Sequence, residues 1–465
     1  MASGYLGLFL EQTLCRRNKI MYSCGNGYCF KKNGWTYIHI EGEPYERGFQ
    51  HGYLLAEDMA RALNAIKHYI YFMEGKEFGF FVDNANRMFT PFLEKTPEYE
   101  EEMRGIVAGA QKAGVYVSFE EILGWNGVME LNISWWPWKK RHSSIEEARI
   151  GNCSAFIATG DATKDGTIVM AHNTWEEFTI GQAFHVVMDI EPSDGFGIIM
   201  QTAPGYIASM TDFFVTSASL VGTETTIQIK KFREEGKPEF LRAREAMQYA
   251  STIESWVKMI KQDNNGGYAN SWLLGDIKAN EIARFELGLE YDNLTKTTNG
   301  MFVGFNAAED PRIRNIESGR KSSYFVDIRG GVGARRLRWK QITDEYYGRI
   351  DVKAAKKMIA DHYDVYLNKW NPCCRTICSH FDIDPGEFPN TCVPYSLHSA
   401  LDGKVLDGEL AGKMQFFARW GRPCGTPFYA AKFLEEHPQW DWQQGYLEDM
   451  PTQPWTLFGK EMSGT

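Results

Sequence analysis

Apolar and polar positions alternate in two different rhythms along this chain, and the rhythm changes about one third of the way along. In the first third, apolar residues recur at helical spacing, as in Leu55, Met59, Leu63, Ile66 and Ile70. Residues three and four positions apart lie on one face of a helix. The first 150 residues are therefore predicted to be mainly helical.

Helix boundaries in this first part are marked by capping residues. Thr96 precedes Pro97 and a run of acidic residues, and Gly114 follows the periodic stretch, which is the expected pattern of a helix start and stop. Ser118 and Glu121 have the spacing of a capping box, in which each side chain bonds the other residue's backbone N–H. Two successive helices are predicted here.

After residue 152 the pattern becomes that of strands. The segments "CSAFIAT" and "TIVMAHNTW" are joined by the turn-rich "GDATKDG", which predicts a β-hairpin. Strands and helices then follow in blocks rather than in strict alternation, which favours an α+β fold with an antiparallel sheet core and helical layers. The further predicted elements are strands in "AFHVVMDIE", "FGIIMQTA", "DFFVTSASLV", "SWLLGDI" and "IARFELGLEY", and helices around 239–250, 252–262 and 334–361.

Composition narrows the class of protein. The 465 residues are 43% hydrophobic and 24% charged, with a net charge of −10. No basic stripe or zinc-finger pattern is present, so a nucleic-acid partner is not expected. No apolar run approaches the roughly 18 residues of a membrane span. The basic residues of "GYLGLFLEQTLCRRNKI" follow its apolar positions, the reverse of a signal peptide. We therefore expect a cytoplasmic protein, or a secreted or lysosomal one whose signal segment has been removed.

The Asn152-Cys153 step stands at the head of the first predicted strand. A free cysteine is usually a buried core residue. A cysteine that becomes a new N-terminus is instead a nucleophile, because its own α-amine, with a reference pKa of about 7.7–8.0, can act as its general base. The residues alone leave both interpretations open.

Three further segments carry candidate chemistry. In the predicted hairpin, the end of the second strand returns beside the start of the first, which brings His172 close to Cys153. Asn270, just before a predicted strand, could donate to a developing oxyanion, or could be a turn residue. Among the arginines of "GVGARRLRWKQ", Arg335 is our candidate to reach the cysteine site.

The segment "NPCCRTICSHFD" holds Cys373, Cys374, Cys378 and His380. Three thiols and an imidazole so close together suggest a metal, yet their spacing fits none of the usual zinc patterns. No metal and no cofactor are therefore predicted, and the role of these four residues is left open.

Several stretches together resemble the phospholipase B-like family, within the wider group of self-cleaving N-terminal-nucleophile (Ntn) hydrolases. They are "NCSAFIATGDATKDGTIVMAHNTW", "APGYIASMTDFFVTSASLVGTETTI" and "YANSWLLGDI", and "EGEPYERGFQHGYLL" resembles the pro-segment of the acyltransferase branch of that group. The resemblance implies an αββα four-layer sandwich over residues 153–465, with residues 1–152 as a helical pro-segment.

The resemblance also implies site roles. Cleavage is expected between Asn152 and Cys153, with Cys153 as nucleophile, Asn270 as oxyanion contact, and His172 in the site. Related bile-salt and penicillin-type amidases carry Arg and Asp where this chain has His172 and Trp175, which favours the phospholipase B-like branch. Contact with the substrate is expected for four residues: Asn173, Trp175, Asp212 and Trp272.

The predicted activity is hydrolysis of an acyl ester or amide bond in a lipid-like small molecule, through an acyl-thioester on Cys153. Two alternatives stay open: an acyltransferase that uses an amine acceptor, and an uncleaved, non-enzymatic binding protein of the same fold. The sequence leaves the substrate and the oligomeric state open, a homo-oligomer included.

Overall fold

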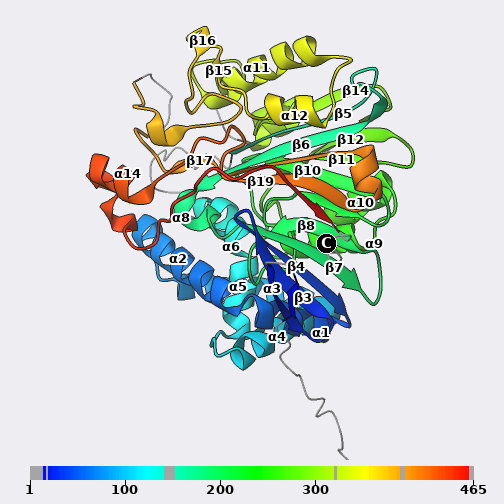
Figure 1. The fold of residues 1–465 in the computed structure, drawn as a ribbon, viewed down its shortest axis with the longest axis vertical. Coiled ribbons are helices and arrows are strands. Elements are labelled where there is room, and N and C mark those ends of the chain that lie inside the picture. The colour runs from blue at the N-terminus through cyan, green and yellow to red at the C-terminus, as the bar shows by residue number, and fades with distance from the viewer. Residues whose placement is uncertain (1–13, 17–18, 141–151, 319–321, 388–392, 460–465) are drawn as a thin grey trace, which may run out of the picture.

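The computed structural model describes residues 14–16, 19–140, 152–318, 322–387 and 393–459. Its centre is a pair of β-sheets (Figure 1). The larger sheet has eleven strands in the described residues, and its neighbouring strands are antiparallel except for the parallel pair β4 and β7. In sheet order the strands are β1 (Leu14–Arg16), β2 (Lys19–Cys24), β3 (Gly27–Lys32), β4 (Trp35–Gly42), β7 (Val186–Pro192), β8 (Ile198–Thr202), β9 (Phe214–Thr216), β10 (Leu220–Thr226), β11 (Asn270–Asp276), β12 (Glu281–Leu287) and β13 (Asp292–Thr297).

The smaller sheet is antiparallel throughout the described chain and is built around the predicted hairpin, which is confirmed. A separate two-stranded ribbon joins β15 (Tyr363–Asp364) to β16 (Lys369–Trp370). The strands of the smaller sheet are β14 (Gly300–Gly304), β5 (Asn152–Gly160), β6 (Gly166–Glu177), β18 (Asp402–Asp407), β19 (Gln415–Trp420) and β20 (Thr456–Gly459), with β17 (His398–Ala400) also paired to β6.

Helices cover the outer face of each sheet (Figure 1). On the side of the larger sheet lie α1 (Pro44–Leu54), α2 (Ala56–Glu74), α3 (Phe78–Leu93), α4 (Pro97–Lys112), α5 (Phe119–Asn126), α6 (Val128–Glu130), the π-helical turn η1 (Leu131–Trp135), α9 (Glu239–Tyr249) and α10 (Ile253–Lys261). On the side of the smaller sheet lie α11 (Gly331–Tyr346) and α12 (Val352–Met358). The short elements elsewhere are α7 (Trp136–Lys139), α8 (Phe178–Gly181), η2 (Ile313–Glu317), η3 (Ser322–Phe325), η4 (Phe381–Ile383), α13 (Gly408–Gly412), α14 (Ala430–Glu436) and η5 (Pro438–Gln443).

Alternation along the strands separates three cores, since successive side chains of a strand point to opposite faces. Met188 of β7 packs toward the helices, while its neighbour Val187 packs between the sheets. In the smaller sheet, Ile157 packs between the sheets and Phe156 packs against α11 through Trp339. The fold is therefore an αββα four-layer sandwich, as expected.

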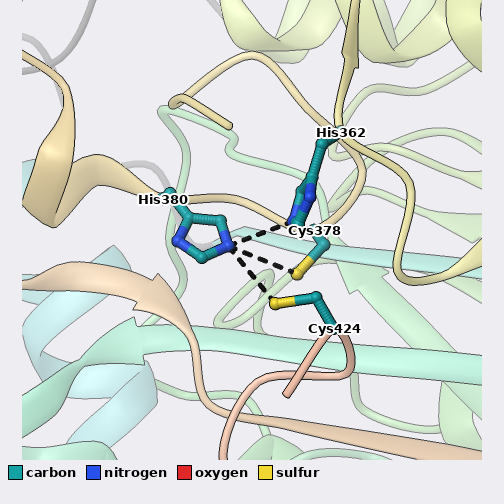
Figure 2. A group of neighbouring side chains, drawn as sticks. All are labelled: His362, Cys378, His380 and Cys424. Carbon is teal, nitrogen blue, oxygen red and sulfur yellow. Dashed lines mark hydrogen bonds between the residues drawn. The ribbon is translucent and has the colours of Figure 1, made fainter. Parts of the chain in front are cut away.

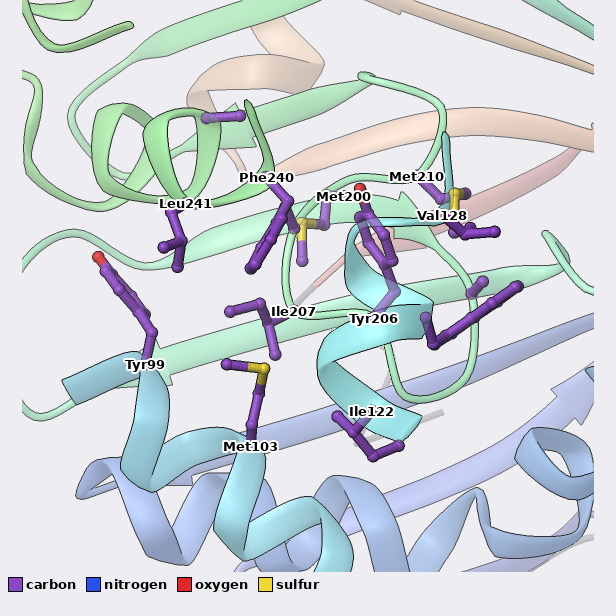
Figure 3. Packing of buried hydrophobic residues seen from close by; sticks show 14 of the residues in the cluster. Tyr99, Met103, Ile122, Val128, Met200, Tyr206, Ile207, Met210, Phe240 and Leu241 are labelled. Carbon is purple, nitrogen blue, oxygen red and sulfur yellow. The ribbon is translucent and has the colours of Figure 1, made fainter. Parts of the chain in front are cut away.

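The core under the N-terminal helices joins distant parts of the chain. Figure 3 shows Met103 of α4 pointing toward Ile207 and toward Phe240 of α9. All three side chains are buried in the same apolar cluster. This layer thus fixes the helices of the first 140 residues onto the larger sheet.

The prediction that the first 150 residues are mainly helical is wrong for the described residues 14–16 and 19–42, which contain β1 to β4. Two tight hairpin turns lie here, Gly25-Asn26 and Asn33-Gly34, a signal that the helical interpretation overlooked. Asn33 and Gly34 both have positive φ, at 50° and 81°. Because β4 pairs in parallel with β7, strands from before and after Cys153 share one sheet.

The predicted helix starts agree with the structure in most details. Helix α4 begins at Pro97 after Thr96, although the Thr96 hydroxyl donates to the Phe92 carbonyl rather than accepting a cap bond. Ser118 and Glu121 form the predicted capping box of α5. The helices predicted around 239–250 and 252–262 are α9 and α10.

Helices α1 and α4 approach so closely that only glycine fits at their contact. A Cβ added to Gly48 would lie 2.0 Å from the Glu102 carbonyl oxygen, and one added to Gly105 would lie 2.3 Å from the Tyr45 carbonyl oxygen. Such distances would force the two backbones apart. The glycines of "ERGFQHGY" and "MRGIVAGA" are therefore explained by packing.

A buried ion network crosses the same contact. The Glu102 carboxylate accepts from Arg47 Nε at 2.7 Å and from Arg244 Nη1 at 2.9 Å, and all three side chains are fully buried. Burial by itself raises the pKa of Glu102, but the two guanidinium groups outweigh it and lower the pKa. The carboxylate thus ties α1, α4 and α9 together.

Glu102→Gln should destabilise the protein by about 3–5 kcal/mol, because it removes the anion that pairs with buried Arg244 and leaves buried Arg47 with only its ion pair to Glu98. Glu100→Gln is the matched control on the same helix, where the carboxylate is partly exposed and bonds Arg104 at one-turn spacing. The control should cost less than about 1 kcal/mol. Chemical denaturation of both variants checks this, and equal losses would contradict the role given to Glu102.

Candidate active site

Cys153 is the second residue of β5 and lies directly opposite Thr174 of β6. Its side chain is 5% exposed, and its sulfur is in the free thiol form. Ala155, two residues on, lies opposite His172. The end of β6 thus returns beside the start of β5, as the hairpin predicted.

Two side chains from later in the chain hold the Cys153 backbone. The Cys153 N–H donates to Asn306 Oδ1 at 3.0 Å. The Cys153 carbonyl accepts from Arg335 Nη1 at 2.6 Å, and Arg335 Nη2 donates to the same Asn306 oxygen at 3.0 Å. The structure therefore brings Arg335 to the cysteine.

Asn306 is a site residue that the sequence reasoning missed. It follows β14 in a turn, with a φ of 64°, a left-handed conformation that asparagine tolerates better than most residues. Its Nδ2 donates to the Thr226 carbonyl at the end of β10 at 3.1 Å. The only signal in the sequence is an asparagine in the turn-like "GFNAAED", which does not point to Cys153.

Cys153 lines a small pocket. Residues that precede the expected cleavage point in the sequence and residues that follow it both line this pocket. The pocket holds about 10 Å³, close to the space that a single water needs. Met129 of α6 and Ile133 of η1 cover it from the N-terminal segment. Its other lining residues are Thr174, Trp175, Glu176, Phe184, Met210, Thr211, Thr226 and Tyr268.

The Cys153 thiol is held in its neutral form. Burial raises its pKa well above the usual value, and the Glu224 carboxyl raises it further. A hydrogen bond from the Trp175 backbone and the charge of Lys404 act in the opposite direction but do not outweigh burial. In the intact chain the thiol must therefore give up its proton when it attacks a carbonyl, because the thiolate is the nucleophilic form.

Lys404 belongs to a buried polar group beside β6. Its Nζ donates to Thr174 Oγ1 at 2.7 Å and pairs with Asp402 Oδ1 at 2.9 Å. Gln201 bonds both members, accepting from Lys404 and donating to Asp402 Oδ2. Burial lowers the pKa of Lys404, while Asp402 opposes this shift. The cluster thus places a buried ion pair near the neutral thiol, in which Lys404 lowers the pKa of Cys153 and Asp402 raises it.

His172 lies on the Cys153 face of the sheet, two residue pairs further along the hairpin. It is fully buried, and neither ring nitrogen makes a hydrogen bond of good geometry within the described residues, although the Glu224 backbone lies close enough to raise its pKa. Burial lowers its pKa well below the usual value, with Lys404 adding to the effect. The imidazole is therefore neutral at pH 7, and no described contact joins it to Cys153.

Asn270 is the first residue of β11 and pairs in register with Thr226. Residues paired in this way project to the same face of a sheet, and Thr226 lines the Cys153 pocket. The Asn270 amide is buried, and neither its oxygen nor its nitrogen has a partner within the described chain. A buried amide without partners is uncommon and calls for an explanation.

Asn173 holds strands and loops together. Its Oδ1 accepts from the Ser154 N–H and from Trp175 Nε1, each at 3.0 Å. Its Nδ2 donates to the carbonyls of Ile359 and Ile377. These bonds use both donors of the amide. The geometry thus gives Asn173 a structural role in place of the expected substrate contact.

Trp175 contacts both the pocket and Arg335. The guanidinium of Arg335 lies 4.3 Å from the centre of its ring. Trp175 also lines the pocket itself. A cation held against an indole ring is stabilised by the ring's charge distribution. The substrate contact expected of Trp175 stays a prediction.

The last two residues expected to contact the substrate are Asp212, which lies beside the pocket, and Trp272, which lies in the core under the helices. Asp212 adjoins the pocket residue Thr211, and burial, followed by Glu239 and Glu224, raises the pKa of its carboxyl well above normal. Trp272 is buried in the core under the helices, with its ring 4.7 Å from that of Trp256. That position gives Trp272 a packing role in the described structure.

The pocket offers no set of metal ligands among the described residues. The one described group of histidine, cysteine and acidic side chains close enough to hold a metal ion lies elsewhere and does not include Cys153. No described helix is both long and apolar enough to cross a membrane.

Comparison with known proteins places the chain in a family. A protein of Archaeoglobus fulgidus, named only as uncharacterized, is 27% identical over 299 residues, 60% of this chain and 47% of its own length. Phospholipase-B 81 of Drysdalia coronoides is 25% identical over 341 residues, 67% of this chain and 59% of that protein. Phospholipase B of Crotalus adamanteus is 25% identical over 325 residues, 62% of this chain and 55% of that protein. The chain thus spans about half of the length of these relatives.

Among solved structures, the C2A mutant of conjugated bile acid hydrolase from Clostridium perfringens aligns with a TM-score of 0.34 and 12% identity, covering 58% of this chain and 89% of that one. The family model described as Phospholipase B matches residues 29–294, more than half of the chain. The matched region includes the whole β5–β6 hairpin and Asn270. The chain belongs to the phospholipase B family.

Proposed function

We propose that this chain is a self-cleaving Ntn hydrolase, cut between Asn152 and Cys153, that hydrolyses acyl esters or amides. One observation carries the proposal: Asn306 and Arg335 bind the backbone nitrogen and carbonyl of the residue whose sulfur lines the pocket. Ordinary core cysteines have their backbone groups bonded within the sheet. Here the N–H is bonded to a side chain, which can keep holding that nitrogen after it becomes an amine.

Self-cleavage would begin with attack of the Cys153 sulfur on the Asn152 carbonyl carbon. The C–S bond forms, the C–N bond breaks, and the proton of the thiol passes to the departing nitrogen, which leaves a thioester and a free α-amine. Water then hydrolyses the thioester and restores the thiol. Asn306 Oδ1, 3.0 Å from this nitrogen, would orient the new amine.

In turnover the α-amine takes the proton of the Cys153 thiol, and the thiolate attacks the carbonyl of a bound ester or amide. The tetrahedral oxyanion collapses to an acyl-thioester, and the ammonium group protonates the leaving alcohol or amine. Water activated by the same amine releases the acid. Asn270 is our candidate for the oxyanion contact, supported by its buried amide without partners in the described residues.

The substrate we propose is an acyl chain on a polar head, as in a phospholipid or an N-acyl amide. The family supports this class, and Met129, Ile133, Phe184 and Met210 give the pocket apolar walls. At about 10 Å³ the pocket of the intact chain holds no acyl chain. Opening the pocket requires movement of the residues that cover it from the N-terminal segment.

Hydrolysis and acyl transfer share the acyl-thioester and differ only in what attacks it. Purified protein incubated with phosphatidylcholine vesicles or an N-acyl amide should release free fatty acid. Added primary amines should leave the amount of acid unchanged if water is the acceptor. Conversion of the acid into new amides would instead assign the alternative, an amine acyltransferase.

Cleavage of the purified protein should yield two fragments, and the second should begin Cys-Ser-Ala-Phe. Cys153→Ala should stay a single chain without activity, because it lacks the attacking sulfur. Electrophoresis and N-terminal sequencing check this.

The control for this experiment is Cys29→Ala, which removes a buried thiol on β3, outside the pocket. It should cleave like the parent chain. An intact parent chain that hydrolyses the substrate would exclude the mechanism.

Asn306→Leu should slow self-cleavage and turnover at least tenfold, because the amine loses its acceptor and the guanidinium of Arg335 loses one bond. The pH profile of turnover should also shift, a change that a purely structural defect would not produce. Asn299→Leu is the matched control, since its Oδ1 also accepts a backbone N–H, from Asp161 at 2.7 Å, at the far end of the hairpin. Similar rates and pH profiles for the two variants would remove Asn306 from the mechanism.

Asn270→Ala should lower kcat by about 10²–10³-fold with a much smaller change in KM, as expected when one donor to an oxyanion is removed. The folded state should survive, because the amide has no partner within the described chain. Steady-state kinetics on the cleaved enzyme measures this. A variant with unchanged kcat would show that Asn270 does not contact the oxyanion.

A further inference from the structure

A second group of reactive side chains lies behind β6, outside the Cys153 pocket. It consists of His362, Cys378, His380 and Cys424, which come from three separate parts of the chain (Figure 2). Their ligand atoms all lie within 4.8 Å of one another. Figure 2 shows the two sulfurs and the His362 ring directed toward one nitrogen of His380. We name these four residues the Cys2His2 cluster.

The distances within the Cys2His2 cluster match those of ligands around one zinc ion. His380 Nε2 lies 3.1 Å from His362 Nε2, 3.5 Å from Cys424 Sγ and 3.8 Å from Cys378 Sγ. A tetrahedral site with ordinary Zn–N and Zn–S bonds separates two nitrogens by about 3.3 Å and a nitrogen from a sulfur by about 3.6 Å. The three distances from His380 Nε2 therefore fit the spacing of zinc ligands, and the remaining pairs of ligand atoms lie within 4.8 Å.

We propose that the Cys2His2 cluster binds one Zn²⁺ ion as a closed, structural site. Two thiolates and two imidazoles complete a tetrahedron and leave no position for a substrate or water, which distinguishes structural from catalytic zinc sites. Three of the four side chains are buried, and Cys424 is partly exposed, which gives the ion a way in. Binding displaces the two thiol protons to solvent, so the affinity falls as the pH falls.

The loop that carries Cys424 has the local form of a thiolate ligand. The Thr426 N–H donates to Cys424 Sγ at 3.4 Å, a bond that supports negative charge on the sulfur. Gly425 between them has a φ of 85°, which favours glycine at this turn. The sequence Cys424-Gly425-Thr426 thus presents the sulfur with a backbone donor already in place.

The proposed ion would hold the segments that carry residues 362, 378–380 and 424 against β6, the strand that borders the Cys153 pocket. Cys378 packs with Trp175 and Ala400 in one small apolar cluster. The carbonyl of Ile377, next to Cys378, accepts from Asn173 Nδ2 at 3.0 Å. Zinc would therefore hold the backing of β6 in place without contacting the substrate, so the ligands are positioning residues.

The protein as purified in the presence of a phosphine reductant should contain about one zinc ion per chain by mass spectrometry of the metals. Replacing zinc by Co²⁺ should give the intense visible bands of tetrahedral cobalt together with sulfur-to-metal charge transfer. Cys424→Ser and His362→Gln should each lose the bound metal and the cobalt spectrum.

The matched control is Cys373→Ser, a buried cysteine in the same segment whose Sγ lies 3.5 Å from Asp364 Oδ2 and outside the Cys2His2 cluster. It should keep the zinc. Cys153→Ala should keep it too, even if the chain is not cleaved, so the test does not depend on the proposed activity.

Three results would overturn the zinc proposal. The first is reduced, chelator-treated protein that takes up neither Zn²⁺ nor Co²⁺. The second is full metal content in both Cys424→Ser and His362→Gln. The third is a Cys378–Cys424 disulfide found by peptide mapping of freshly purified protein.

Discussion

One side-chain oxygen, Oδ1 of Asn306, joins three parts of the chain at Cys153. It accepts from the Cys153 N–H of β5 and from the Arg335 guanidinium of α11, while the other end of the same amide bonds β10 through Thr226. Leaving one buried donor of this kind unsatisfied costs about 1–3 kcal/mol. The smaller sheet, the larger sheet and the outer helix are therefore held at a fixed relation around the thiol.

This arrangement holds the Cys153 backbone in place but does not ionise the Cys153 thiol. Burial keeps the Cys153 thiol neutral, and His172, which is also neutral, has no described contact with it. Activation by a free α-amine on the same residue fits these surroundings, because it needs no charged neighbour. The Cys2His2 cluster supports the other side of β6, through Cys378 against Trp175. Arg335, which bonds Cys153, and the Cys2His2 cluster behind β6 thus both support the hairpin, and all of these residues come from the last third of the chain.

Much of the fold could be predicted from local patterns. The β5–β6 hairpin, α5 with its capping box, and the pair α9 and α10 follow from turn residues, caps and periodicity, which act within a few residues of each other. The strands before residue 43 were missed although the turns Gly25-Asn26 and Asn33-Gly34 mark them, because the longer helical pattern that follows dominated the interpretation. The parallel pairing of β4 with β7 has no local signal at all.

For the candidate sites, the sequence by itself determined which residues near the hairpin are candidates for the chemistry: Cys153 at a strand start, and the polar residues that follow the turn. Only the tertiary structure decided their partners. Asn306 and Arg335 reach Cys153 from 153 and 182 residues away, and Cys424 meets His380 from 44 residues away. Spacing along the chain misled where it grouped Cys373 and Cys374 with His380. The physical reason is that strand pairing and core burial set these distances, and neither depends on nearness in sequence.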